Sequence, residues 1–175
     1  MRSTWLLAAL LLPLLSAPAT AATVPLRSLL VGGTQSTGSL TLDKNTFLVS
    51  KCTGETRDLL LGVTQLSLAK AGRIDQVAVL AQREYLTPKE RMAFNGAVLN
   101  VAFKCFNLRT ERKAAILTWL DRQNASALRN VSAEFGPMIL NFERQLEDDG
   151  TFWTSVSLSR SGVPGVSPWI NYCTP

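Results

Sequence analysis

The residue types that could do chemistry in this chain are limited first by an absence, because its 175 residues include no histidine. Serine–histidine–aspartate and cysteine–histidine systems both need an imidazole to take the proton from the nucleophile. Histidine is also the commonest zinc ligand, and the sequence shows no metal-binding cluster of other residues. We therefore predict no nucleophile of these kinds, no metal and no other cofactor.

Ser67 and Lys70 have the S-x-x-K spacing of penicillin-binding enzymes, in which a lysine one helical turn away assists the serine. In those enzymes the serine stands at the start of a helix, whereas Ser67 falls near the end of a predicted one. The companion S-D-N and K-T-G motifs are absent. We assign no catalysis to this pair.

Paired carboxylates are the remaining route to an enzyme. In a small glycosidase acting on cell-wall polysaccharide, one acid protonates the leaving oxygen and another stabilises the cation or activates water. The acids nearest to predicted element boundaries are Glu55, Asp58, Glu84 and Glu90. No motif marks them, and Glu90 also fits a helix-capping role, so the glycosidase is an alternative and not the leading hypothesis.

Three cysteines, Cys52, Cys105 and Cys173, allow one disulfide and one remaining thiol in an oxidising compartment. Three pairings are possible, and the sequence does not choose among them. Cys105 lies on the apolar face of a predicted helix, Cys52 ends a predicted strand, and Cys173 lies in a tail that would fray without a tether. We favour Cys52–Cys105, a link worth about 4 kcal/mol in the chain-entropy model.

The first 21 residues have the three parts of a secretory signal peptide. Arg2 supplies the positive charge, an apolar run extends from Trp5 to Leu15, and Ala19-Thr20-Ala21 is a cleavage pattern. The run is shorter than the about 20 residues that a membrane-spanning helix needs. We expect export to the periplasm or the cell exterior, with residues 22–175 forming one globular domain and no membrane span.

The mature chain would be modestly basic. Removing the leader takes away Arg2 and no acid, which leaves 17 basic and 13 acidic residues and a formal charge of +4. The basic residues are spread out, with one loose group at Lys104, Arg109, Arg112 and Lys113, which Glu111 dilutes. A nucleic-acid-binding protein would show a denser stripe with interleaved aromatics, so we predict no nucleic-acid partner. Weak attraction to an anionic wall polymer or membrane surface stays open.

Apolar spacing predicts a hairpin whose two strands flank a turn at residues 43–45, and it predicts a further strand over 151–159. Thr87-Pro88-Lys89-Glu90 is a helix start with a capping box, opening a mostly apolar helix to about Asn107 at the centre of the core. Further helices are expected over residues 56–71, 74–85, 110–122, 125–135 and 137–148. Leu26–Val31 is expected as a strand, and an irregular tail from about residue 160.

The resulting expectation is an α+β domain. About five helices form a bundle on a small antiparallel sheet, which is built from the N-terminal hairpin and a C-terminal strand.

The leading functional hypothesis is a non-enzymatic exported binding or accessory protein of the cell envelope, such as an inhibitor or an immunity-type partner. Its partner would be another protein or an envelope polymer, contacted through an exposed patch around Trp153, Trp169 and Tyr172. The alternatives are the glycosidase and a carrier with an apolar cavity beside the 88–107 helix. The sequence does not determine the oligomeric state.

Overall fold

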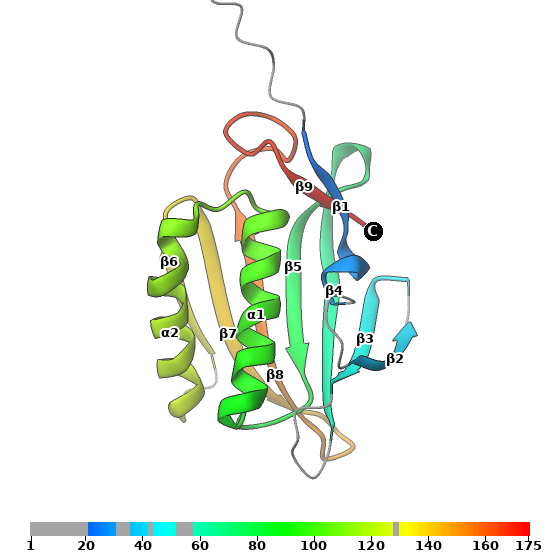
Figure 1. Ribbon diagram of the computed structural model, residues 1–175, viewed down its shortest axis with the longest axis vertical. Helices are drawn as coiled ribbons and strands as arrows, with labels where there is room; N and C mark the ends of the chain where they lie inside the picture. The colour runs from blue at the N-terminus through cyan, green and yellow to red at the C-terminus, as the bar shows by residue number, and fades with distance from the viewer. Residues whose placement is uncertain (1–20, 31–35, 42–43, 52–57, 128–129) are drawn as a thin grey trace, which may run out of the picture.

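The computed structural model describes residues 21–30, 36–41, 44–51, 58–127 and 130–175. Nine β-strands, two α-helices and three short 3-10 helices make up this part of the chain (Figure 1). In chain order they are β1 (Thr23–Pro25), η1 (Leu26–Leu29), β2 (Ser36–Thr41), β3 (Thr46–Lys51), β4 (Leu59–Ala69), η2 (Lys70–Gly72), β5 (Arg73–Ala81), α1 (Pro88–Lys104), η3 (Thr110–Arg112), α2 (Lys113–Ala125), β6 (Asn130–Phe135), β7 (Met138–Leu146), β8 (Phe152–Arg160) and β9 (Tyr172–Thr174).

Seven strands form one antiparallel sheet in the order β2-β3-β4-β5-β8-β7-β6, and α1 and α2 lie against one of its faces (Figure 1). Side chains alternate between the two faces of a strand, so the strands from β3 onward in this sheet turn one set of alternate residues toward the helices. One row across the sheet shows this, because its registered residues are all apolar: Phe47, Val63, Val79, Val156, Phe142 and Val131.

The core lies between this face and the helices. Phe94, Val98 and Val101 of α1 and Ile116 of α2 are at most 1 % exposed. The other face carries many serine, threonine and asparagine side chains, as is usual where one side of an antiparallel sheet meets water. The row Thr46, Thr64, Ala78, Ser157, Asn141 and Ser132 runs across it.

The capping box predicted at the start of α1 is confirmed. The Thr87 hydroxyl accepts a hydrogen bond from the amide of Glu90 at 3.4 Å, and the Glu90 carboxylate accepts one from the amide of Thr87 at 2.9 Å. Arg83 adds an ion pair to Glu90, with Nε 2.8 Å from Oε1. Glu90 is 1 % exposed, so the buried carboxylate is fully engaged in holding the helix start.

A second, two-stranded sheet joins β1 to β9 in parallel. A disulfide between Cys105, at the end of α1, and Cys173, in β9, fixes this small sheet to the helix layer. The irregular chain from residue 161 to 171 loops over the same end of the molecule (Figure 1). The tail predicted as irregular therefore ends in a short strand.

The predicted bundle of about five helices on a small sheet is wrong. Residues predicted as helices at 56–71, 74–85, 125–135 and 137–148 form β4, β5, β6 and β7 instead. In β7 the helical spacing selects Ile139, Phe142 and Leu146, of which Ile139 and Leu146 are 45 % and 54 % exposed. Met138, Leu140 and Phe142, which follow one another at intervals of two, are at most 1 % exposed. The apolar residues of this segment fit both the period of two that is typical of a strand and the period near 3.6 that is typical of a helix. Packing against α1 and α2 favours the strand.

Other parts of the sequence prediction are confirmed. The helix from Pro88, the helix that follows Thr110, the hairpin around residues 43–45 and the strand ending near residue 160 all exist. Leu26–Val31 was predicted as a strand, but η1 is a 3-10 helix over its first four residues.

Residues 1–20 of the predicted signal peptide lie outside the described residues. Within the described ranges, neither helix has the length and apolar character required to cross a bilayer.

Candidate functional site

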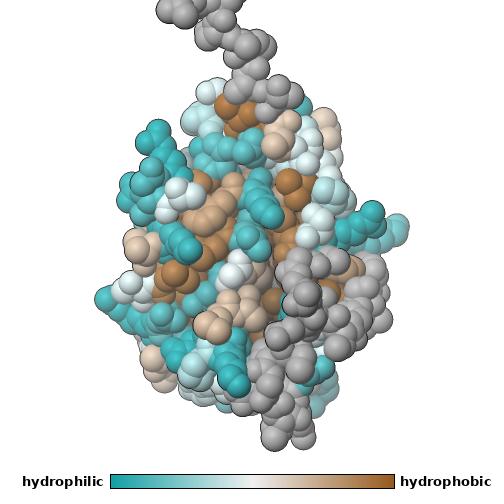
Figure 2. Space-filling view, viewed as in Figure 1, coloured by the Kyte–Doolittle hydropathy of each residue, from teal (hydrophilic) through white to brown (hydrophobic). Residues whose placement is uncertain are grey.

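A cleft of about 380 Å³ opens at the end of the molecule where α1 ends and α2 begins. Its walls come from the α1–α2 connection, the β6–β7 turn, the last residue of β8 and the C-terminal loop. In Figure 2, hydrophilic side chains gather at this upper left part of the surface, over the start of α2. The lining residues are Asn107, Leu108, Arg109, Arg112, Gly136, Pro137, Arg160 and Pro168.

Arg160 is the most firmly held of the three arginines. Its Nη1 donates to the carbonyl oxygen of Phe106, and its Nη2 donates to that of Pro168 at 3.3 Å. The guanidinium carbon lies 5.6 Å from the ring centroid of Trp169, within the range of a cation–π contact. Its Nε is buried and has no hydrogen-bond partner among the described residues. Burial lowers the pKa of Arg160 below its ordinary value.

The connection after α1 is shaped to frame the cleft. Asn107 has a φ of 50°, in the left-handed region that asparagine tolerates better than most residues. Its Nδ2 donates to the carbonyl oxygen of Pro168 at 3.2 Å. Asn107 and Arg160 thus hold the same carbonyl group, which fixes the C-terminal loop against the end of α1.

Arg109 directly precedes η3, Arg112 is its last residue, and both are exposed. Arg112 reaches toward the β6–β7 turn, since its Nη2 is 4.0 Å from the position that a Cβ would take on Gly136. The ion pairs within the described ranges join Arg83 to Glu90 and Arg91 to Asp121, so none involves the cleft arginines. Among the described residues that line the cleft there is no carboxylate, and Glu111, which lies between Arg109 and Arg112 in the chain, is exposed and outside this lining. Three positive charges therefore face one concavity without a counter-charge in its lining.

Comparison with known proteins adds no assignment. Nothing among protein-family models, curated proteins or solved structures matches this chain significantly. What the protein does must therefore be argued from its own residues.

The structure does not bring the three predicted binding aromatics together. Trp169 is completely buried, packs 5.4 Å from the ring of Phe106, and cannot contribute to an exposed patch. Trp153, near the start of β8, and Tyr172, in β9, are both half-buried. The start of β8 and strand β9 lie toward opposite ends of the molecule (Figure 1), and Arg73 covers the ring of Tyr172 at 4.8 Å. Trp169 is therefore removed from the predicted patch, and binding at Trp153 and Tyr172 stays a prediction.

The predicted Cys52–Cys105 disulfide is also wrong, because Cys105 is bonded to Cys173. Cys52 lies outside the described residues. Cys173 lies in a predicted irregular tail that would fray unless a covalent link held it. This position was the feature of the sequence that favoured a disulfide at Cys173.

Of the candidate acids of the glycosidase hypothesis, the three that the structure describes, Asp58, Glu84 and Glu90, line none of these three pockets. Glu90 is buried in the capping box, and Asp58 accepts a hydrogen bond from the Ser50 hydroxyl at 2.9 Å. Glu84 is half-buried, and Glu55 lies outside the described residues. Ser67 is in β4, not in a helix, and donates a hydrogen bond to Asp75. Within the described residues, no three acids or cysteines are grouped to hold a metal ion.

A second hollow, of about 540 Å³, lies on the outer side of the helix layer between α1 and α2. Leu99 and Leu117 contribute apolar walls, and Arg91, Asn95 and Asp121 make one part of it polar. Hydrophobic surface is visible between the helices in Figure 2. This is a surface groove, whereas the carrier hypothesis required an apolar cavity beside α1.

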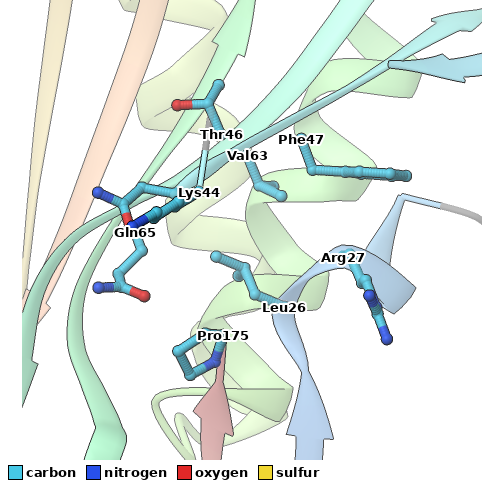
Figure 3. Close-up of a pocket in the computed structure, with 9 residues that line it drawn as sticks. Leu26, Arg27, Lys44, Thr46, Phe47, Val63, Gln65 and Pro175 are labelled. Atoms are coloured by element: carbon cyan, nitrogen blue, oxygen red, sulfur yellow. The ribbon is translucent and has the colours of Figure 1, made fainter. Parts of the chain in front are cut away.

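The third hollow, of about 120 Å³, lies between η1 and strands β3 and β4 (Figure 3). Leu26 and Val63 supply apolar walls, Lys44 and Gln65 lie close together at one side, and Arg27 extends away from them. Sites for small organic ligands have volumes of roughly 300–1,000 Å³. This pocket is below that range, whereas the arginine cleft is within it.

Sequence reasoning found two of the cleft residues, Arg109 and Arg112, as part of a loose basic group. It missed Arg160, which is 48 residues further along the chain at the end of a serine-rich strand. The other two members of that group, Lys104 and Lys113, are exposed and do not line the cleft. Only the pairing of β8 with β7 and the closure of the C-terminal loop bring Arg160 to the site.

Proposed function

We propose that this protein is an exported, non-enzymatic binding protein of the cell envelope that holds an anionic group of its partner in the arginine cleft. The partner would be an envelope polymer or another protein. The observation that carries the proposal is the arrival of Arg109, Arg112 and Arg160 at one cleft whose lining includes no carboxylate. The predicted signal peptide supports the compartment.

Electrostatics favours an anionic ligand. Like charges gathered in one concavity repel each other, and low-dielectric walls strengthen both that repulsion and the attraction of an anion. Guanidinium groups also present planar arrays of N–H donors that match carboxylate and phosphate oxygens. A bound anion would relieve the repulsion and satisfy those donors.

The chemistry of the lining favours binding over catalysis. The side chains offer guanidinium groups, one amide and the apolar surfaces of leucine and proline. None of these groups takes up a proton at neutral pH or serves as a common nucleophile. Such a site can fix and orient an anion but has no evident means to transform it.

Binding to an anionic polymer tests the proposal. Calorimetric titration of the oxidised protein with dextran sulfate, with neutral dextran as reference, measures the polymer affinity. We expect the double variant Arg109→Gln/Arg112→Gln to lose about tenfold or more in affinity, since each charge-assisted contact is worth more than 1 kcal/mol.

The matched control is Lys70→Gln/Lys89→Gln, which removes the same charge from two exposed positions outside the cleft. We expect a change of less than about twofold, since neither lysine lines the cleft and salt screens interactions between exposed charges. Equal losses for both pairs would show a diffuse charge effect and would contradict a specific site.

A further inference from the structure

We infer that the arginine cleft recognises a terminal phosphate group, a phosphomonoester carried on a compact organic unit, and not a carboxylate. This inference rests on the proposed function and specifies the ligand of the same site. It follows from how the guanidinium groups are anchored, from the number of charges and donors they present, and from the size of the cleft.

The three arginines come from different walls, and Arg160 is the one held by hydrogen bonds among the described residues. Arg160 is fixed over the carbonyl oxygens of Phe106 and Pro168, and Arg112 lies beside the β6–β7 turn at Gly136. Arg109 enters from the other end of η3. An anion in the cleft therefore meets donors from several directions and not one planar fork.

Carboxylate and phosphate differ in how many such donors they can use. A carboxylate has two oxygens in one plane, carries one negative charge, and is satisfied by a single guanidinium in a bidentate pair. A phosphomonoester presents three strong acceptor oxygens in a tetrahedral arrangement and has a charge between about −1.5 and −2 at neutral pH. Three guanidinium groups can donate to all three oxygens of the phosphate. Their combined positive charge is also closer in size to the charge of a phosphate than to that of a carboxylate.

Arg160 reinforces this match as a fixed charge. Two of its nitrogens are engaged with main-chain carbonyls, and these neutral acceptors leave its positive charge uncompensated. The burial that lowers its pKa also means that the cation is partly removed from water without an anion to replace the lost hydration. A dianion nearby would stabilise the charged form.

The size and walls of the cleft indicate what carries the phosphate. A volume of about 380 Å³ far exceeds what one tetrahedral ion needs, given that a water occupies about 30 Å³ in the liquid. Leu108, Pro137 and Pro168 supply carbon surface beside the arginines. A sugar or glycerol unit attached to the phosphate would use this surface and fill the remaining space.

Titrations with small anions of matched charge test the inference. Methyl phosphate, malonate and acetate are added to the isotopically labelled, oxidised protein, and binding is followed through the arginine Nε–Hε resonances and by calorimetry. We expect methyl phosphate to bind at least about tenfold more tightly than malonate, which also carries two charges but only planar carboxylates, and acetate to bind more weakly still. Arg112→Gln should reduce this preference, while Lys89→Gln should leave it unchanged.

The outcomes separate the two proposals. If malonate binds as tightly as methyl phosphate, the preference for phosphate is refuted and the anion-binding function stands. If none of the anions binds at low ionic strength and dextran sulfate also fails to bind, the proposed function is refuted as well. Glycerol 3-phosphate and vesicles containing phosphatidic acid then identify the source of the phosphate, because they present the same terminal group in solution and on a membrane.

Discussion

Trp169 donates its indole N–H to the carbonyl oxygen of Cys105 over 2.7 Å, and the sulfur of the same Cys105 is bonded to Cys173. One residue at the end of α1 therefore holds the C-terminal segment at two points. Between them the chain is too short to move away from α1 independently. The carbonyl of Pro168, which anchors both Asn107 and Arg160, is thereby fixed in the wall of the cleft.

This double attachment predicts that the disulfide supports both stability and the cleft. Reduction, or Cys173→Ser, should lower the free energy of unfolding by about 4 kcal/mol, because the link closes a separation of 68 residues. The same change should weaken anion binding by releasing Pro168 from Arg160. Urea unfolding with and without reductant measures the first effect, and calorimetric titration measures the second.

Cys52→Ser is the control for the cysteine chemistry. The oxidised variant should keep its disulfide, and thiol counting should fall from one free thiol per chain to none. A Cys52→Ser protein that loses its disulfide would contradict the Cys105–Cys173 pair.

Arg144 should be the most costly arginine to replace. It is 4 % exposed and donates to the carbonyl oxygens of Glu84, Gln123, Asn124 and Ser126. Gln123 and Asn124 lie in the last turn of α2, and Ser126 is its C-cap. A cation is favoured at the carboxyl end of a helix, where unpaired carbonyls concentrate negative charge.

We expect Arg144→Met to lower the free energy of unfolding by about 3 kcal/mol or more, since it leaves several buried acceptors without donors. Arg122→Met, at an exposed position in the same helix, should change it by less than about 0.5 kcal/mol. Urea unfolding of both variants measures the difference, and equal small effects would show that Arg144 is dispensable.

Replacing glycine by alanine should have opposite effects on stability at Gly62 and at Gly96. A Cβ on Gly62 would collide with the side chain of Leu48 on the neighbouring strand and lie 3.4 Å from the carbonyl oxygen of Phe47. Gly62→Ala should therefore destabilise the fold by about 1–3 kcal/mol.

A Cβ on Gly96, in the middle of α1, would meet no atom within 4 Å. Gly96→Ala should stabilise the protein by about 1 kcal/mol, because alanine has the higher helix propensity. Thermal or urea unfolding of the two variants checks the pair. A loss of stability in Gly96→Ala would mean that something occupies the open space beside that residue in solution.

The capping box at the start of α1 gives the fourth prediction. Thr87→Ala removes the acceptor for the Glu90 amide and should cost about 1 kcal/mol of stability. Thr118→Ala, at an exposed position inside α2, should be neutral or slightly stabilising. Chemical denaturation resolves a difference of this size, and equal effects would argue that the cap contributes nothing.

The sequence by itself determined the parts of this protein whose signals are local. Thr87, Pro88 and Glu90 mark the start of α1 through hydrogen bonds that close within one helical turn. The turn-favouring residue types at positions 43–45 mark the hairpin between β2 and β3. The lack of histidine limited the chemistry before any fold was known.

Tertiary structure decided the rest, because the competing patterns were equally compatible with the local sequence. Leu59, Leu61 and Val63 alternate as a strand, yet Leu59, Leu60 and Val63 also fit a helix, and only packing against η1 and α1 made the first pattern the buried one. The cleft arose in the same way. Arg109 and Arg160 are 51 residues apart, and no local rule brings them together. Sheet pairing and the disulfide do so, since both act between distant parts of the chain.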